Sequence, residues 1–259
     1  MLALLQFPPL IVGFLWVAAF VVISVGGLFV FRRAVSHTKL ENANFVSGAV
    51  FQVAGVLYAV LVAFVVVVVW EQFGDAEDAS SKEASAVADL LRDSTALPPQ
   101  YRAEVQQSLV AYSHDVVDNE FTRMRRGESI EEQSDALTRV WDSYLKVQPE
   151  SRSEIAFFDY AISRLNDLST NRKMRVSTGD ASVPGELWVL LLGGGGVLMM
   201  FTYLFGTRDV VVHAIAVGLT ASLLAFVMYL IFALEHPYVG ALSVKPTPYV
   251  NMLKDWAGG

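Results

Sequence analysis

Residues 44–70 read NFVSGAVFQVAGVLYAVLVAFVVVVVW and contain no charged side chain. Because about 20 apolar residues in a helix cross a hydrocarbon core of about 30 Å, this stretch predicts a membrane-spanning helix. Three further stretches without Asp, Glu, Lys or Arg run from about 10 to 31, from 187 to 207 and from 210 to 234. The 259-residue chain is therefore expected to be an all-α integral membrane protein that crosses the bilayer four times.

The four predicted spans form two hairpins. The loops 32–41 and 206–209 are short, so the spans on either side of each loop are expected to be antiparallel neighbours. The predicted domains are a first transmembrane hairpin, an acidic extramembrane helical bundle, a second transmembrane hairpin and a C-terminal tail, at 1–70, 71–186, 187–235 and 236–259.

Residues 71–186 show helical periodicity and no strand alternation. No Gly or Pro occurs between Asp75 and Leu97. The second span is therefore expected to leave the membrane as one long helix that ends at Pro98-Pro99. Further helix boundaries are predicted by a C-terminal glycine and by two capping boxes, at Gly127, at Ser129 with Glu132, and at Ser151 with Glu154.

Charge is divided unevenly along the chain. Residues 71–186 carry 22 acidic and 13 basic side chains, a net charge of −9, whereas the whole chain carries −7. This acidic excess argues against nucleic acid as a partner. The chain has no cysteine, which excludes disulfides and thiolate chemistry. No motif of a hydrolase, a phosphate-binding loop or a zinc enzyme occurs in a supporting context, so we expect neither an enzyme nor a cofactor.

Basic residues in short loops indicate the orientation in the membrane, because such loops stay in the cytoplasm. Arg32, Arg33 and Lys39 lie in the first short loop, and Arg208 lies in the second. This pattern predicts a multi-pass protein of the cell membrane with an extracytoplasmic bundle. Three other basic residues favour the opposite side and are interpreted as partners of acidic bundle helices or lipid headgroups, namely Arg172, Lys173 and Arg175.

Small and polar residues recur along the second span at spacings of three or four, which places them on one stripe of a helix. They are Asn44, Gly48, Gln52, Gly55, Ala59 and Ala63. Small residues allow helices to pack closely in lipid. Alternatively, the stripe lines a pore, where small side chains leave a path for water and the amides meet a passing ion. A symmetric oligomer can use one stripe for both purposes.

Three carboxylates follow this span at positions i, i+4 and i+7, namely Glu71, Asp75 and Asp78. Around a symmetry axis they would form rings at a pore mouth and concentrate cations. They would also offer oxygen ligands to Ca²⁺, although no EF-hand loop is present. The alternative is a solvated acidic helix face. His213 and His236 are expected to hold the ends of the fourth span.

The chain resembles a family of bestrophin-like membrane proteins of unknown function. The residues that carry this resemblance are Trp70-Glu71-x-Phe73, Glu83-Ala84, Leu97-Pro98, Tyr112, Glu120, Arg172, Pro184 with Trp188, and Pro237-Tyr238-x-Gly240. Remote similarity to bestrophins, which are pentameric anion channels, implies an oligomeric ion channel whose second helix lines a central pore. This chain departs from bestrophins in having only Phe51 and Phe64 along that helix. It also lacks the compact acidic clasp that binds calcium.

Two functional hypotheses follow. The first is a homo-oligomeric ion channel in the lipid bilayer, with inorganic ions as its substrates and the second span as its pore wall. The second is a non-conducting sensor or scaffold whose helical bundle binds a partner. The orientation also stays open, because bestrophins place their large helical part in the cytoplasm, opposite to the side that the charged loops favour here.

Overall fold

The computed structural model describes residues 9–35, 40–41, 44–180, 182–240 and 242–258. These residues form helices and connecting segments, and none of them is in a β-strand. They divide into two compact units. We call the first the membrane unit, which comprises the described residues up to Glu71 together with Ser182–Glu235. We call the second the helical bundle, which comprises Gln72–Ala181 and His236–Gly259.

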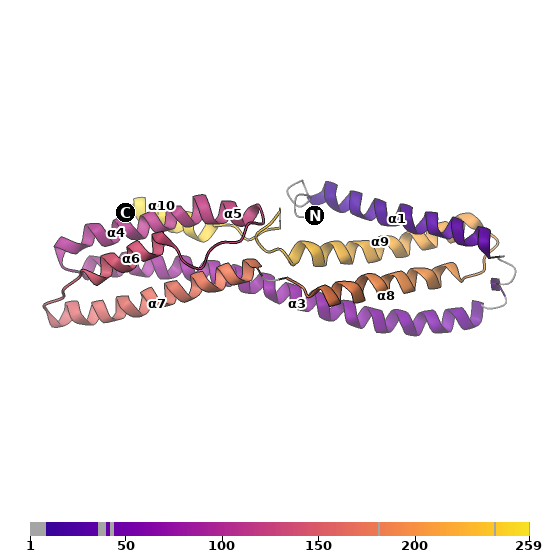
Figure 1. Cartoon of the computed structure of the whole chain (residues 1–259), viewed down its shortest axis with the longest axis horizontal. Coiled ribbons are helices and arrows are strands. Elements are labelled where there is room, and N and C mark those ends of the chain that lie inside the picture. The colour runs from indigo at the N-terminus through magenta and orange to yellow at the C-terminus, as the bar shows by residue number, and fades with distance from the viewer. Residues whose placement is uncertain (1–8, 36–39, 42–43, 181, 241, 259) are drawn as a thin grey trace. The chain divides into compact units, whose positions relative to one another are not determined.

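The membrane unit contains the four predicted spans (Figure 1). They are α1 (Pro9–Ala34), the first part of α3 (Asn44–Asp93), α8 (Gly185–Tyr203) and α9 (Val210–Leu234). Four helical stretches that include these elements are long and apolar enough to cross a membrane. The all-α fold with four spans is therefore confirmed, except that the third span ends at Tyr203 rather than at Thr207. The loop 36–39, including Lys39, lies outside the described residues.

Helices of the membrane unit approach one another at glycines. α1 packs along α9, and α8 packs against α9. The Tyr58 hydroxyl of α3 donates to the Leu191 carbonyl of α8 at 2.8 Å. A Cβ added at Gly194 would lie 2.7 Å from the Tyr58 ring, whereas one added at Gly193 would meet nothing within 4 Å. Part of the glycine run in α8 therefore permits close helix approach.

α3 continues as one helix from the membrane unit into the bundle, as the sequence predicts. It ends at Asp93, a single 3₁₀ turn covers Ser94–Ala96, and α4 (Pro99–Asp115) starts directly after Pro98. Proline suits the first helical position because its missing N–H has no partner there in any helix. The proline pair therefore both ends the long helix and starts the next one.

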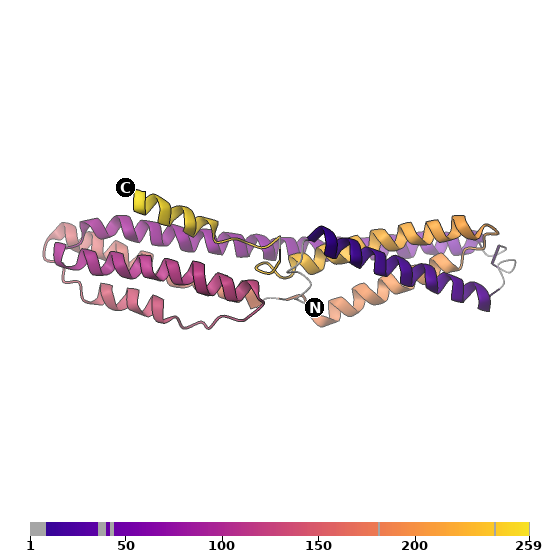
Figure 2. The same cartoon turned by 90° about the horizontal axis from the view of Figure 1, so that it is seen from above.

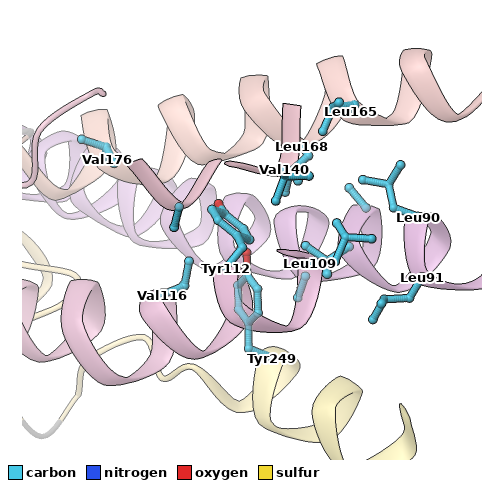
Figure 3. Packing of buried hydrophobic residues seen from close by; sticks show 14 of the residues in the cluster. Leu90, Leu91, Leu109, Tyr112, Val116, Val140, Leu165, Leu168, Val176 and Tyr249 are labelled. Atoms are coloured by element: carbon cyan, nitrogen blue, oxygen red, sulfur yellow. The ribbon is translucent and has the colours of Figure 1, made fainter. Parts of the chain in front are cut away.

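The bundle packs several helices around the second part of α3, which is visible in two views (Figures 1 and 2). α4 is followed by a π-helical turn, η3 (Val116–Glu120), and by α5 (Phe121–Arg125). The remaining elements are α6 (Asp135–Leu145), α7 (Arg152–Asp180) and α10 (Thr247–Gly258). Apolar side chains from α3, α4, α6, α7 and α10 share one core, into which Tyr249 of α10 points (Figure 3).

Two of the three predicted helix boundaries in the bundle are confirmed. Gly127 follows α5 with a φ of 74°, a left-handed conformation that glycine adopts without strain. Before α7, Ser151 Oγ accepts from the Glu154 N–H at 3.1 Å, and Glu154 Oε2 accepts from the Ser151 N–H at 3.0 Å.

The capping box at Ser129 and Glu132 is wrong. α6 starts later, at Asp135, and the Ser134 side chain caps it by accepting from the Leu137 N–H at 3.2 Å. The segment before Ser134 is not helical because the guanidinium of Arg172 takes the carbonyl oxygens of Glu131 and Glu132, at 3.0 and 2.5 Å. A local pattern cannot reveal a partner that lies 40 residues away in the sequence.

Candidate functional site

The small-residue stripe of α3 is partly uncovered in the single chain. Gln52, Ala59 and Ala63 are exposed, and Gly48 and Gly55 are half-buried. A Cβ added at Gly55 would meet nothing within 4 Å. From Gln52 to Ala63 the stripe thus forms an open flank of mostly small side chains, interrupted by the exposed Val56, which we call the α3 flank.

Asn44 lies at the start of the same stripe, and both polar atoms of its side-chain amide make hydrogen bonds. Its Nδ2 donates to the Gly206 carbonyl at 2.8 Å, and its Oδ1 accepts from the Gly206 N–H at 2.7 Å. Asn44 therefore ties the start of α3 to the turn between α8 and α9. The segment 204–207 is bound in this way instead of continuing α8, which explains why the third span ends early.

The three carboxylates predicted at a pore mouth are all exposed. Glu71 is the last residue of the membrane unit, and Asp75 and Asp78 belong to the bundle. Asp78 Oδ2 lies 3.4 Å from Lys82 Nζ, one turn further along the helix. No group of three or more His, Asp or Glu side chains within the described residues is arranged to hold a metal ion. The suggested Ca²⁺ site therefore has no structural support there.

The bundle buries four charged side chains that contact one another. Arg175 of α7 binds Glu83 of α3 through two hydrogen bonds, Nε to Oε2 at 2.5 Å and Nη2 to Oε1 at 3.1 Å. Its Nη2 also donates to Glu120 Oε2. Arg172 Nη2 donates to the other oxygen of Glu120 at 2.7 Å. We call these four residues the buried charge network. Its two positive and two negative charges balance, which a buried ionic cluster requires.

Neighbouring side chains complete the hydrogen bonding of this network. The Tyr112 hydroxyl of α4 donates to Glu83 Oε1 at 2.5 Å, and the Arg175 guanidinium lies 5.3 Å from the centre of the Phe121 ring. Both guanidinium groups are at most 2% exposed. Four helical elements are thus joined through one polar centre.

The electrostatics of the network follow from its pairing. Burial acts to lower the pKa of Arg175, but the carboxylates of Glu83 and Glu120 outweigh it and raise that pKa well above its ordinary value. Burial likewise acts to raise the pKa of Glu120, but Arg175 and Arg172 outweigh it and lower that pKa. Burial, with Glu83 nearby, raises the pKa of Tyr112 well above 10.0. The tyrosine therefore stays a hydrogen-bond donor at neutral pH.

The sequence points to all four members of this network but indicates a role only for the two arginines. Glu83, Tyr112, Glu120 and Arg172 belong to the residues that carry the family resemblance. The interpretation of Arg172 and Arg175 as partners of acidic bundle helices is confirmed. Lys173 Nζ instead lies 3.9 Å from Glu132 Oε2 in the non-helical segment before α6. A signal for burial was present, because the buried face of α7 continues at helical spacing through Leu165, Leu168, Arg172 and Arg175.

The fold and this site define a helical membrane protein with an inserted helical bundle, and comparison with known proteins identifies its kind. A Bestrophin-like domain matches residues 18–249, and the chain belongs to that family. No curated protein gives a significant match.

Solved structures share this fold at low sequence identity. A crystal structure of a bacterial bestrophin homologue from Klebsiella pneumoniae, carrying one substitution, is 15% identical, with a TM-score of 0.65 over 94% of this chain and 99% of that one. A crystal structure described only as a membrane protein is also 15% identical, with a TM-score of 0.68 over 94% and 99%. Bestrophins are ion channels, and family and fold together favour a channel-like function in general terms.

Proposed function

We propose that the chain forms a homo-oligomeric ion channel in the cell membrane. The α3 flank lines its central pore, and Glu71, Asp75 and Asp78 lie at the pore mouth. The observation that carries this proposal is Gln52. Its side chain is exposed in the middle of an apolar span, and it makes no hydrogen bond within the described residues. An amide that faces lipid without a hydrogen-bond partner costs roughly several kcal/mol. The side chain is therefore more stable where it meets water or a polar partner.

The side chains beside Gln52 support the same assignment. Ala59 and Ala63 are exposed on the same flank, where small side chains leave room for water. Other exposed positions of the spans carry bulky apolar groups that suit lipid, such as Phe64 at 68% and Phe14 at 72% exposure. The α3 flank, with its polar and small side chains, thus differs from the other exposed surfaces of the spans, which are apolar and suit contact with lipid.

The charge at the proposed mouth favours cations. Three exposed carboxylates per chain would be repeated around the axis of an oligomer, and rings of carboxylates concentrate cations and repel anions. Lys82 neutralises part of this charge, because it pairs with Asp78. The proposal therefore assigns the stronger influence to Glu71 and Asp75.

Planar bilayers with the purified oligomer test this function. Wild-type protein is expected to pass current, and Gln52→Leu is expected to reduce the conductance because it replaces an amide by a bulky apolar group. Val53→Leu, at the neighbouring exposed position off the flank, is the matched control. Glu71→Ala with Asp75→Ala is expected to lower the preference for cations, measured as a shift of the reversal potential in a salt gradient. Asp118→Ala removes one exposed carboxylate of the bundle outside α3 and is expected to change it less.

The second candidate is a non-conducting scaffold, which the net charge of −9 over residues 71–186 favours as a docking surface for a basic partner. A folded oligomer that passes no current under any ionic condition would contradict the channel and support the scaffold. The proposed extracytoplasmic side of the bundle is tested separately by labelling single engineered cysteines in intact cells. Lys82→Cys reports on the bundle and Arg208→Cys on the hairpin turns, and the native chain adds no thiol background.

A further inference from the structure

The turns of the two transmembrane hairpins are joined by polar contacts within the membrane unit. Asn44 binds the backbone of Gly206, as described above, and Arg32 Nη2 donates to the Thr207 carbonyl at 3.0 Å. Arg208 Nε donates to Glu41 Oε1 at 3.1 Å. We call this set of contacts the turn clasp. The two turns approach each other closely here, because a Cβ added at Gly206 would lie only 2.2 Å from the backbone nitrogen of Glu41.

His213, in the first turn of α9, is the titratable group buried at this clasp, with 4% of its surface exposed. Its Nε2 lies 2.9 Å from the Thr202 carbonyl oxygen, and its Nδ1 lies 3.1 Å from Arg32 Nη1. A carbonyl oxygen only accepts and a guanidinium only donates hydrogen bonds. Nε2 must therefore carry the hydrogen and Nδ1 must be the acceptor. One form of the ring satisfies both contacts, the neutral imidazole with its hydrogen on Nε2.

The charges around the ring give a second proton no stabilising partner. From α1 the ring meets Arg32, and from α8 it meets the Thr202 carbonyl. In the turn before α9, Asp209 caps that helix by accepting from two backbone N–H groups, and Arg208 is paired with Glu41. None of these carboxylates contacts the ring within the described residues. A proton on Nδ1 would place an N–H and a positive charge against the Arg32 guanidinium.

We propose that His213 is a proton-sensitive latch of the turn clasp. Its neutral ring holds Arg32 in position, and its protonation breaks the Arg32 contact and loosens the joint between the two hairpins. Like charges in a buried site repel strongly, so a proton on Nδ1 and the Arg32 guanidinium cannot share this contact. A change of conduction with pH rests in addition on the proposed function, since Asn44 joins the same clasp to the start of α3.

Nitrogen NMR of the ¹⁵N-histidine-labelled protein in nanodiscs tests the ring directly. The resonance that disappears in His213→Gln identifies the residue. At pH 8 it is expected to show a neutral ring protonated at Nε2, and on acidification a second proton is expected at Nδ1. A neutral ring with its hydrogen on Nδ1, a ring already doubly protonated at pH 8, or a ring that stays neutral at every pH at which the protein is folded would overturn the proposal.

Hydrogen exchange tests the release of the clasp without any need for conduction. After correction for intrinsic rates, exchange of the amides of Gly206 and His213 is expected to rise about tenfold between pH 8 and the pH at which the ring carries its second proton. His213→Gln keeps a donor towards the Thr202 carbonyl but cannot titrate, so its exchange should not depend on pH. Should this variant not fold, Arg32→Gln removes the repelling charge and should reduce the pH response.

His114→Gln is the matched control, because His114 is exposed in the bundle and faces Asp118. This variant should respond to pH as the wild type does. Equal responses of wild type and His213→Gln would contradict the latch. A pH-dependent clasp in an oligomer that passes no current would instead contradict the proposed channel and leave the latch supported.

Discussion

The membrane unit and the helical bundle differ in the side chains that they expose and in the charges that they bury. In the membrane unit large apolar residues are exposed, for example Phe45 at 90%, and helices meet at glycines and through single polar contacts. In the bundle apolar residues are buried and the centre also holds four charged side chains, of which Arg175 is 0% exposed. α3 belongs to both units and changes its character at their boundary.

This difference reflects the two solvents. Apolar side chains gain no stability by moving out of hydrocarbon. Helices in the membrane are therefore held together mainly by close packing and by hydrogen bonds across helices. In water the apolar groups of the bundle are driven into its core. A buried ionic centre is stable in that core only when its charges are paired in good geometry. Substitutions should therefore change stability through packing in the membrane unit and through unpaired buried charge in the bundle.

The largest effect is expected from Arg175→Leu in the bundle. This change leaves Glu83 and part of Glu120 without their main partner, and the loss of one member of a buried ion pair costs about 3–5 kcal/mol. Chemical unfolding followed by hydrogen exchange of α4 and α7 measures it. Arg126→Leu is the matched control, because Arg126 is 63% exposed in its side chain and pairs with Glu128 only at the surface. Equal stability of the two variants would show that the network contributes nothing.

A smaller effect is expected in the membrane unit from Gly194→Ala. The added methyl group would lie 2.7 Å from the Tyr58 ring, which is fixed by its hydrogen bond to Leu191. Overpacking of this kind costs about 1–3 kcal/mol. Gly193→Ala at the adjacent open position should be neutral or stabilising by roughly 0.5–1 kcal/mol, because alanine loses less backbone freedom than glycine on folding. Thermal denaturation of both variants in detergent compares them, and the reverse order would contradict close packing at Gly194.

Alkaline pH should weaken the bundle. Burial raises the pKa of Tyr112 and Tyr249 well above 10.0, and it raises the pKa of Tyr238 to about 12. Unfolded tyrosines lose their protons near pH 10 while these stay protonated in the fold. Their stabilising contribution is therefore complete below pH 10 and declines as the pH rises further. Hydrogen exchange of the bundle from pH 9 to 12 measures this, and Tyr238→Phe should reduce the slope. A flat profile would contradict the burial of these hydroxyls.

The smallest effect on stability is expected from Asp78→Ala. The pair with Lys82 is exposed on both sides, at 70% and 65% of the two side chains, and such pairs contribute about 0–1 kcal/mol. Denaturant unfolding should therefore barely distinguish this variant from wild type. A loss of stability comparable to that of Arg175→Leu would contradict the expected difference between buried and exposed charge pairs.

Most of the fold follows from patterns that are local in the sequence. Uncharged runs locate α1, α3, α8 and α9, and the proline pair after Leu97 ends α3, because these signals depend on composition and backbone geometry alone. The start of α6 could not be predicted, since it depends on Arg172, whose carbonyl partners lie 40 and 41 residues away.

The site was predictable to a lesser degree for the same reason. Helical spacing groups Gln52, Ala59 and Ala63 on one flank, and the structure leaves that flank exposed. Spacing cannot show that Asn44 is bound to Gly206, 162 positions further along the chain. It also cannot show which carboxylate Arg175 meets, because a buried ion pair is defined by tertiary packing.

The position of the α3 flank in the assembled particle is the central question, and an electron microscopy map of the purified protein answers it most directly. A symmetric ring is predicted, with Gln52, Ala59 and Ala63 of every chain facing a hydrated axis. A monomer, a dimer, or a ring in which this flank packs against another helix or faces lipid would contradict the proposed channel.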